Sequence, residues 1–181
     1  IVIEDGTMPS QGKRNDLEGA MIAIKEGKKM VDVADEFPTQ WCRYRQSFGV
    51  YAQMHAKRRD FAPKVIYLWG KTGSGKSRWA MDNYPNAGWV SYDGKFFSSK
   101  ISEEVVVFDE FDKWNISPGL VLRLLDRYPL SVNVKGSEQN FIAHTIIMTG
   151  NLPVKKWPFY DKGINRRLTE VIELNGTEVT G

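Results

Sequence analysis

Residues 65–77 read Val-Ile-Tyr-Leu-Trp-Gly-Lys-Thr-Gly-Ser-Gly-Lys-Ser. The first five form a continuous apolar run, which is typical of a strand buried on both faces. The next eight match the pattern G-x-x-x-x-G-K-[ST], and the chain after them predicts a helix over Lys76–Asp82. A strand, a glycine-rich loop and a helix in this order predict a phosphate-binding loop.

We expect the whole loop to contact a nucleotide, because glycines let the backbone approach phosphates and helix-start N–H groups face anions. Lys76 is predicted to reach the β- and γ-phosphates, and the Ser77 hydroxyl to bind Mg²⁺. The alternative is a chance glycine-rich turn, which the flanking strand and helix oppose. The predicted nucleotide-contacting residues are Gly70, Lys71, Thr72, Gly73, Ser74, Gly75, Lys76 and Ser77.

A second predicted strand, Glu104–Phe108, runs into two carboxylates. Asp109 is expected to hold Mg²⁺, and Glu110 to orient or deprotonate the water that attacks the γ-phosphate. Two solvated acids at a strand end are the alternative. The neighbouring Asp112 is interpreted as a surface charge.

A third apolar strand, Thr145–Thr149, leads to Asn151. Its amide is predicted to position water near the γ-phosphate, and the alternative is an asparagine in a turn. Either Arg166 or Arg167, after a flexible run, is predicted to reach the γ-phosphate held by a neighbouring subunit. The alternative for this pair is a solvated position before a last strand.

A hairpin is predicted from strands Leu130–Lys135 and Phe141–Ala143 around Gly136. Lys135 at its tip is expected to hold a DNA phosphate, the alternative being an ordinary exposed lysine. The basic run Lys57-Arg58-Arg59 is interpreted as a solvated linker.

Composition narrows the class of protein. With 181 residues, 41% hydrophobic and 26% charged, the chain is long enough for one globular domain with a small appendage. No uncharged apolar stretch approaches a membrane span. A single cysteine, Cys42, excludes an intramolecular disulfide framework, is consistent with a reducing compartment and is expected to be buried. The net charge of +3 means that nucleic-acid contacts must come from individually placed lysines and arginines.

Three segments follow from the pattern along the chain. Residues 1–16 are rich in turn formers and predict a linker, and residues 17–60 carry apolar residues at helical spacing and predict a small all-helical domain. Residues 61–181 alternate strands with helices, which predicts a mostly parallel α/β sheet. The chain begins Ile-Val-Ile and has its first methionine at Met8, which we interpret as a piece of a longer protein.

The ordered motifs resemble those of superfamily 3 helicases of small viruses, in particular the helicase part of replication-associated proteins of circovirus-like single-stranded DNA viruses. The segment Gln11–Leu17 is similar to the one that follows the endonuclease domain in these proteins. Residues 17–60 are similar to their oligomerisation domain. Residues 1–16 would then be the linker from an N-terminal endonuclease domain, whose His-apolar-His motif this chain lacks.

The resemblance implies an AAA+-related P-loop NTPase fold, a hexameric ring and ATP with Mg²⁺ at subunit interfaces. An arginine, Arg166 or Arg167, would come from the neighbouring subunit, and Lys135 would track single-stranded DNA in the central channel. It further implies 3′-to-5′ unwinding during rolling-circle replication in the host nucleus. The residues that it implies act within one subunit are Lys76, Ser77, Asp109, Glu110 and Asn151.

Other functions stay open at this level. A nucleotide-gated assembly module with little unwinding would need the same loop. A P-loop kinase of small molecules would also need it, although the Asp109–Glu110 pair opposes that reading. RNA could replace DNA, because a lysine that grips phosphate does not recognise the sugar.

Overall fold

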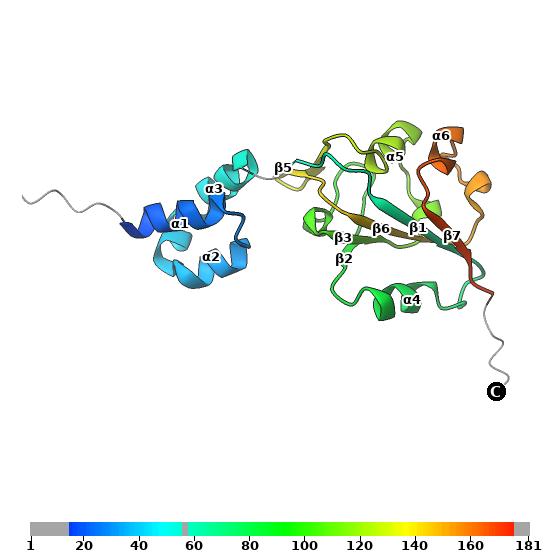
Figure 1. Cartoon of the computed structure of the whole chain (residues 1–181), viewed down its shortest axis with the longest axis horizontal. Helices are drawn as coiled ribbons and strands as arrows, with labels where there is room; N and C mark the ends of the chain where they lie inside the picture. Colours follow the sequence, from blue (N-terminus) through cyan, green and yellow to red (C-terminus); the bar gives the residue numbers. More distant parts are fainter. Residues whose placement is uncertain (1–14, 56–57, 176–181) are drawn as a thin grey trace, which may run out of the picture. The chain divides into compact units, whose positions relative to one another are not determined.

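The computed structural model describes residues 15–55 and 58–175, and its internal contacts divide the chain into two compact units after Ala56. Figure 1 shows both units, which are described here one at a time. Residues 1–14 of the predicted linker lie outside the described residues, and Asn15 and Asp16 begin the first helix.

The first unit consists of three helices, α1 (Asn15–Lys25), α2 (Met30–Glu36) and α3 (Pro38–His55). Their apolar stripes meet in a small core, in which α1 and α2 both pack against α3. Its fully buried members are Ala20, Ile24, Val33 and Phe48. Cys42 on α3 is exposed, so the prediction that it is buried was wrong.

The second unit is built on a five-stranded, all-parallel sheet with the strand order β2-β3-β6-β1-β7. This confirms the predicted α/β class with a mostly parallel sheet. The strands are β1 (Lys64–Trp69), β2 (Gly88–Val90), β3 (Val105–Phe108), β6 (Thr145–Gly150) and β7 (Glu170–Glu173).

Both faces of the sheet are covered, as the continuous apolar runs in β1, β3 and β6 require. Helix α4 (Lys76–Asn83) covers one face, where Ala80 packs on the alternate strand residues Ile66, Leu68, Val107 and Ile147. The other face carries the larger core with α5 (Pro118–Leu124) and α6 (Lys162–Asn165), on the side of the sheet opposite α4 in Figure 1. Three short 3₁₀ turns complete the unit: η1 (Ser99–Ser102), η2 (Phe111–Lys113) and η3 (Val154–Lys156).

The hairpin differs from its prediction in the second strand. It consists of β4 (Ser131–Val134) and β5 (Ser137–Asn140), joined by the two-residue turn Lys135-Gly136. The predicted strand over Phe141–Ala143 was wrong, since the second strand ends at Asn140. The apolar side chains of Phe141 and Ala143 that suggested a strand are instead buried in the core after it. The polar residues of β5 pair with β4 instead, which a pattern of apolar residues cannot indicate.

All five strands are parallel, so the carboxyl ends of β1, β3 and β6 lie at one edge of the sheet. The glycine-rich loop follows β1, Asp109 and Glu110 follow β3, and Asn151 follows β6. Three segments far apart in the sequence therefore meet at this edge, where ligands of open α/β sheets bind.

Candidate nucleotide-binding site

The loop between β1 and α4 turns sharply so that α4 begins directly at Lys76. Gly75 precedes the helix with φ of 87°, a left-handed conformation that a side chain would disfavour. Lys76 is only 9% exposed, and its ammonium donates hydrogen bonds to the carbonyls of Gly70 (2.9 Å) and Lys71 (2.8 Å) and to Asn151 Oδ1 (3.1 Å). Burial lowers its pKa, and the nearby carboxylates oppose that shift.

Asp109 and Ser77 are neighbours. The Ser77 hydroxyl donates to Asp109 Oδ1 across 3.0 Å, and the Thr149 hydroxyl donates to the same oxygen across 2.6 Å. A hydroxyl beside a carboxylate is an oxygen donor pair of the kind that Mg²⁺ prefers, so these residues suit a magnesium ion held together with a nucleotide phosphate. The described residues contain no group of three or more His, Cys, Asp or Glu side chains placed to hold a metal ion.

Glu110 has an unusual backbone conformation, with φ of 48°. Its N–H donates to the Thr149 hydroxyl across 2.9 Å, so Thr149 fixes both consecutive acids. The Glu110 carboxylate is more than half exposed and forms an ion pair with Lys113 at 2.6 Å. Strained residues of this kind cluster at functional sites.

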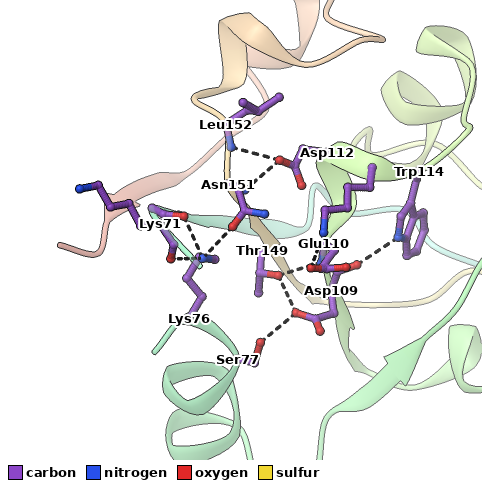
Figure 2. A network of polar contacts seen from close by, with 12 residues as sticks. Lys71, Lys76, Ser77, Asp109, Glu110, Asp112, Trp114, Thr149, Asn151 and Leu152 are labelled. Atoms are coloured by element: carbon purple, nitrogen blue, oxygen red, sulfur yellow. Dashed lines mark hydrogen bonds and ion pairs between the residues drawn. The ribbon is translucent and has the colours of Figure 1, made fainter. Parts of the chain in front are cut away.

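Asn151 occupies the turn after β6, and Figure 2 shows it between Lys76 and Asp112. Asp112 is 4% exposed, so its interpretation as a surface charge was wrong. Its Oδ2 accepts the backbone N–H groups of Asn151 (2.8 Å) and Leu152 (3.1 Å). Burial arises because η2 packs directly against β6.

The two candidate arginines lie in different environments. Arg166 is exposed. The guanidinium of Arg167 is largely buried, forms an ion pair with Asp126 and donates to the Gly163 carbonyl across 2.8 Å. The preceding run was predicted to be flexible, but it buries Trp157 and Phe159 in the core.

Lys135 lies elsewhere, on the two-stranded sheet. Its side chain is exposed at the turn and follows Ser131 and Asn133, the exposed residues of β4. Both of those residues line a groove of about 490 Å³ beside α5, which Lys95 and Arg123 also line.

Sequence reasoning missed three residues that shape the site: Asp112, Thr149 and Trp114, whose indole donates to the Asp109 carbonyl at 3.0 Å. Thr149 had a detectable signal, since it is a polar residue that directly follows the buried apolar residues 146–148 of β6. Asp112 and Trp114 had none, because their contacts depend on how η2 turns back toward β6.

The part of the chain that contains the site matches a known family. Residues 66–152, which contain the loop, both acids and Asn151, match the family described as RNA helicase.

Among the described residues, no helix has the length and apolar character needed to cross a membrane.

Curated relatives named replication-associated protein match most of the chain. Those of canary circovirus and porcine circovirus 1 are both 36% identical to it, over 85% and 87% of this chain and 53% and 51% of their own lengths. That of beak and feather disease virus is 35% identical over 94% of this chain and 60% of the relative. The chain thus spans about half the length of the curated relatives it matches. These matches, together with the phosphate-binding loop at the edge of a parallel sheet, show the family: the chain is the superfamily 3 helicase domain of a circovirus-like replication-associated protein.

Proposed function

We propose that this chain hydrolyses ATP and uses the energy to move along single-stranded DNA during viral replication. The observation that carries the proposal is the meeting of Lys76, Ser77, Asp109 and Asn151 at one edge of the sheet, where Lys76 donates to Asn151 and Ser77 donates to Asp109. The circovirus relatives, which are named for replication, support the biological setting. Action in the host nucleus remains a prediction.

In this proposal, the loop residues Gly70–Ser77 wrap the phosphates and Lys76 exchanges its carbonyl partners for the β- and γ-phosphates. Ser77 and Asp109 hold Mg²⁺, which neutralises charge on the phosphates when bound. Glu110 orients the attacking water and takes its proton, and the Asn151 amide holds that water near the γ-phosphate. In the structure the Glu110 carboxylate pairs with Lys113 across 2.6 Å, so it must turn from Lys113 toward the water.

The remaining parts of the proposal need more than one subunit. Residues 17–60 assemble the chain into a hexameric ring, and an arginine of the neighbouring subunit completes each ATP site. Arg166 is exposed, whereas Arg167 would first have to leave Asp126 and the Gly163 carbonyl. Lys135 grips DNA phosphates in the channel, and the groove beside β4 offers room for the adjoining nucleotide.

A second candidate is an RNA track, which the description of the matched family favours. The lysine at the hairpin tip does not separate the two, because it contacts phosphate and not the sugar. Competition between single-stranded DNA and RNA of equal length and sequence decides between them.

The experiment that tests the function is ATP hydrolysis measured against protein concentration, with and without single-stranded DNA. The specific activity, which is the hydrolysis rate per mole of protein, should rise steeply with protein concentration and rise again with DNA. Glu110→Gln should lower kcat about a hundredfold or more, because general-base catalysis contributes that much. Lys135→Ala should abolish only the stimulation by DNA.

Other outcomes point elsewhere. A specific activity that does not depend on protein concentration would contradict the shared ATP site. Tight ATP binding with assembly but no strand separation on a forked duplex would support a nucleotide-gated assembly module. Transfer of phosphate to a small acceptor would support a kinase.

A further inference from the structure

Asp112 is a buried carboxylate for which the proposed mechanism has no use. It lies in η2, two residues after Glu110, and is 4% exposed. One of its oxygens, Oδ1, is buried and has no hydrogen-bond partner among the described residues. An orphaned buried oxygen costs stability, so the fold alone gives little reason for a carboxylate here.

The other oxygen holds a single turn of the backbone. Asp112 Oδ2 accepts the N–H groups of Asn151 and Leu152 at 2.8 and 3.1 Å. On the far side of the same turn, the Tyr67 hydroxyl donates to the Leu152 carbonyl at 2.5 Å, and the Trp157 indole donates to the Tyr67 oxygen at 2.9 Å. The turn is therefore fixed through both its N–H groups and its carbonyl, as Figure 2 shows for the Asp112 side.

The packing leaves this turn little freedom to shift. A Cβ atom at Gly150 would collide with the Tyr67 hydroxyl and would lie 3.0 Å from Asp112 Oδ1. The strand end can thus approach Asp112 only because residue 150 has no side chain. Asn151 comes directly after this contact.

The turn that Asp112 holds carries the amide that contacts Lys76. Asn151 Oδ1 accepts from the Lys76 ammonium at 3.1 Å, so the orientation of the turn sets where the amide points. The negative charges of Asp112, Asp109 and Glu110 all raise the pKa of Lys76, and that of Asp112 has the largest effect of the three. Its charge and its hydrogen bonds thus both act on the centre of the candidate site.

We propose that Asp112 is a positioning residue that orients Asn151 toward Lys76 and the γ-phosphate. This inference rests on the proposed ATP hydrolysis. It predicts that losing Asp112 acts through Asn151, and that nucleotide binding, which depends on the loop, is largely preserved.

The test is a double-mutant cycle in the full chain, with Asp112→Ala, Asn151→Ala and the double variant. Asp112→Ala should lower kcat about tenfold to a hundredfold, as removing residues that orient a reacting group does. The KM for ATP should change by less than about threefold, since the loop is intact. The double variant should be no slower than Asn151→Ala alone, because the two residues act as one unit.

Two further variants separate positioning from general stability. Asp112→Asn keeps the shape and one acceptor oxygen, so it should restore most of the kcat. Asp82→Ala, an exposed acid on α4, is the matched control and should behave as the native chain. If Asp112→Ala does not fold, Asp112→Asn with Asn151→Ala completes the same cycle, with a smaller expected loss.

Hydrogen exchange of the Asn151 and Leu152 amides gives a readout that needs no hydrolysis. Both amides should exchange faster in Asp112→Ala than in the native chain. Unchanged exchange, an unchanged kcat, or losses that multiply in the double variant would overturn the inference. If the native chain hydrolyses no ATP, the proposed function fails by itself, and the exchange rates still show whether Asp112 holds the turn.

Discussion

Tyr67 illustrates how a single residue links the core of the sheet to the candidate site. Its ring is completely buried, and its hydroxyl is the only polar group of the side chain. Burial raises the pKa of the phenol well above its ordinary value, and the charge of Asp112 raises it further. The neutral hydroxyl must therefore persist in the folded chain at pH values where an exposed tyrosine ionises.

The pH dependence of folding follows from this shift. A tyrosine in the unfolded chain loses its proton near pH 10, at about its reference pKa, whereas folded Tyr67 keeps it. Above that pH the unfolded state binds fewer protons than the folded state, so stability falls as the pH rises. Tyr67→Phe should show a smaller loss between pH 9 and 11 in urea unfolding.

The same substitution should lower stability at pH 8 by about 1–3 kcal/mol, since the Leu152 carbonyl loses its partner. Tyr128→Phe is the control, because Tyr128 is 68% exposed. Equal pH slopes for the native chain and Tyr67→Phe would contradict the assignment.

The sequence indicates the residues of the site that carry a motif and misses those that only support them. Lys76 and Ser77 are recognisable because phosphate binding requires their types at a fixed spacing. Thr149 and Asp112 support the site through hydrogen bonds that form only when β3, η2 and β6 are assembled. Their roles therefore depend on tertiary structure and not on local pattern.

At the scale of elements, α5 is shorter than its apolar pattern predicts. The periodicity suggests a helix over Ser117–Tyr128, but the helix ends at Leu124. Arg59, interpreted from sequence as solvated, is 1% exposed and donates to the carbonyls of Leu124 (2.7 Å), Arg123 (2.8 Å) and Tyr128 (3.0 Å). A cation at the end of a helix satisfies carbonyls that have no partner within it, and a residue 65 positions away cannot be found by periodicity.

Replacing Arg59 should therefore destabilise the second unit. Arg59→Met keeps most of the volume but leaves these carbonyls without donors, at a cost of about 2–4 kcal/mol. It also removes the contact of the guanidinium with the Phe141 ring, 5.0 Å away. Burial lowers the pKa of Arg59 to about 10, so the group remains charged at neutral pH.

Thermal and urea unfolding measure the effect, with Arg58→Met as the matched control. Arg58 is exposed, and its replacement should change stability by less than about 0.5 kcal/mol. Arg59→Lys should fall between the two, because an ammonium cannot span several carbonyls as a guanidinium does. A loss of similar size at both positions would show that Arg59 acts through net charge and not as a cap.

At the scale of the whole molecule, the helical unit presents apolar side chains that its own core does not use. On α3, Val50 and Met54 are 58% and 78% exposed and are spaced by four residues, so they share one face of the helix. Exposed apolar patches on small domains mark protein interfaces. We expect this face to contact another copy of the chain.

The change Val50→Asp with Met54→Asp should shift the chain toward monomers in sedimentation velocity. Arg45→Asp is the charge-matched control, since it also lowers the net charge by two and Arg45 is an exposed residue of α3 that lies five residues from Val50, on another face of the helix. The control should assemble as the native chain does. Equal assembly of all three proteins would place the interface elsewhere.

A ring with shared ATP sites makes a further prediction that no single subunit can satisfy. Glu110→Gln and Arg166→Ala should each be inactive, yet mixing them should restore hydrolysis wherever an intact Glu110 meets an intact Arg166 across an interface. In an equal, random mixture this yields about a quarter of native activity, because each intact group is present with a probability of about one half at a head-to-tail interface. Glu110→Gln mixed with Lys76→Ala should stay inactive, since both groups must come from the same subunit. Arg167→Ala should unfold more readily because Asp126 loses its partner, but the molecules that fold should hydrolyse ATP on their own because they keep Glu110 and Arg166. If Arg167→Ala is instead inactive alone but restores activity when mixed with Glu110→Gln, and Arg166→Ala is active on its own, the shared arginine is Arg167. Its ion pair with Asp126 would then have to open when the ring forms.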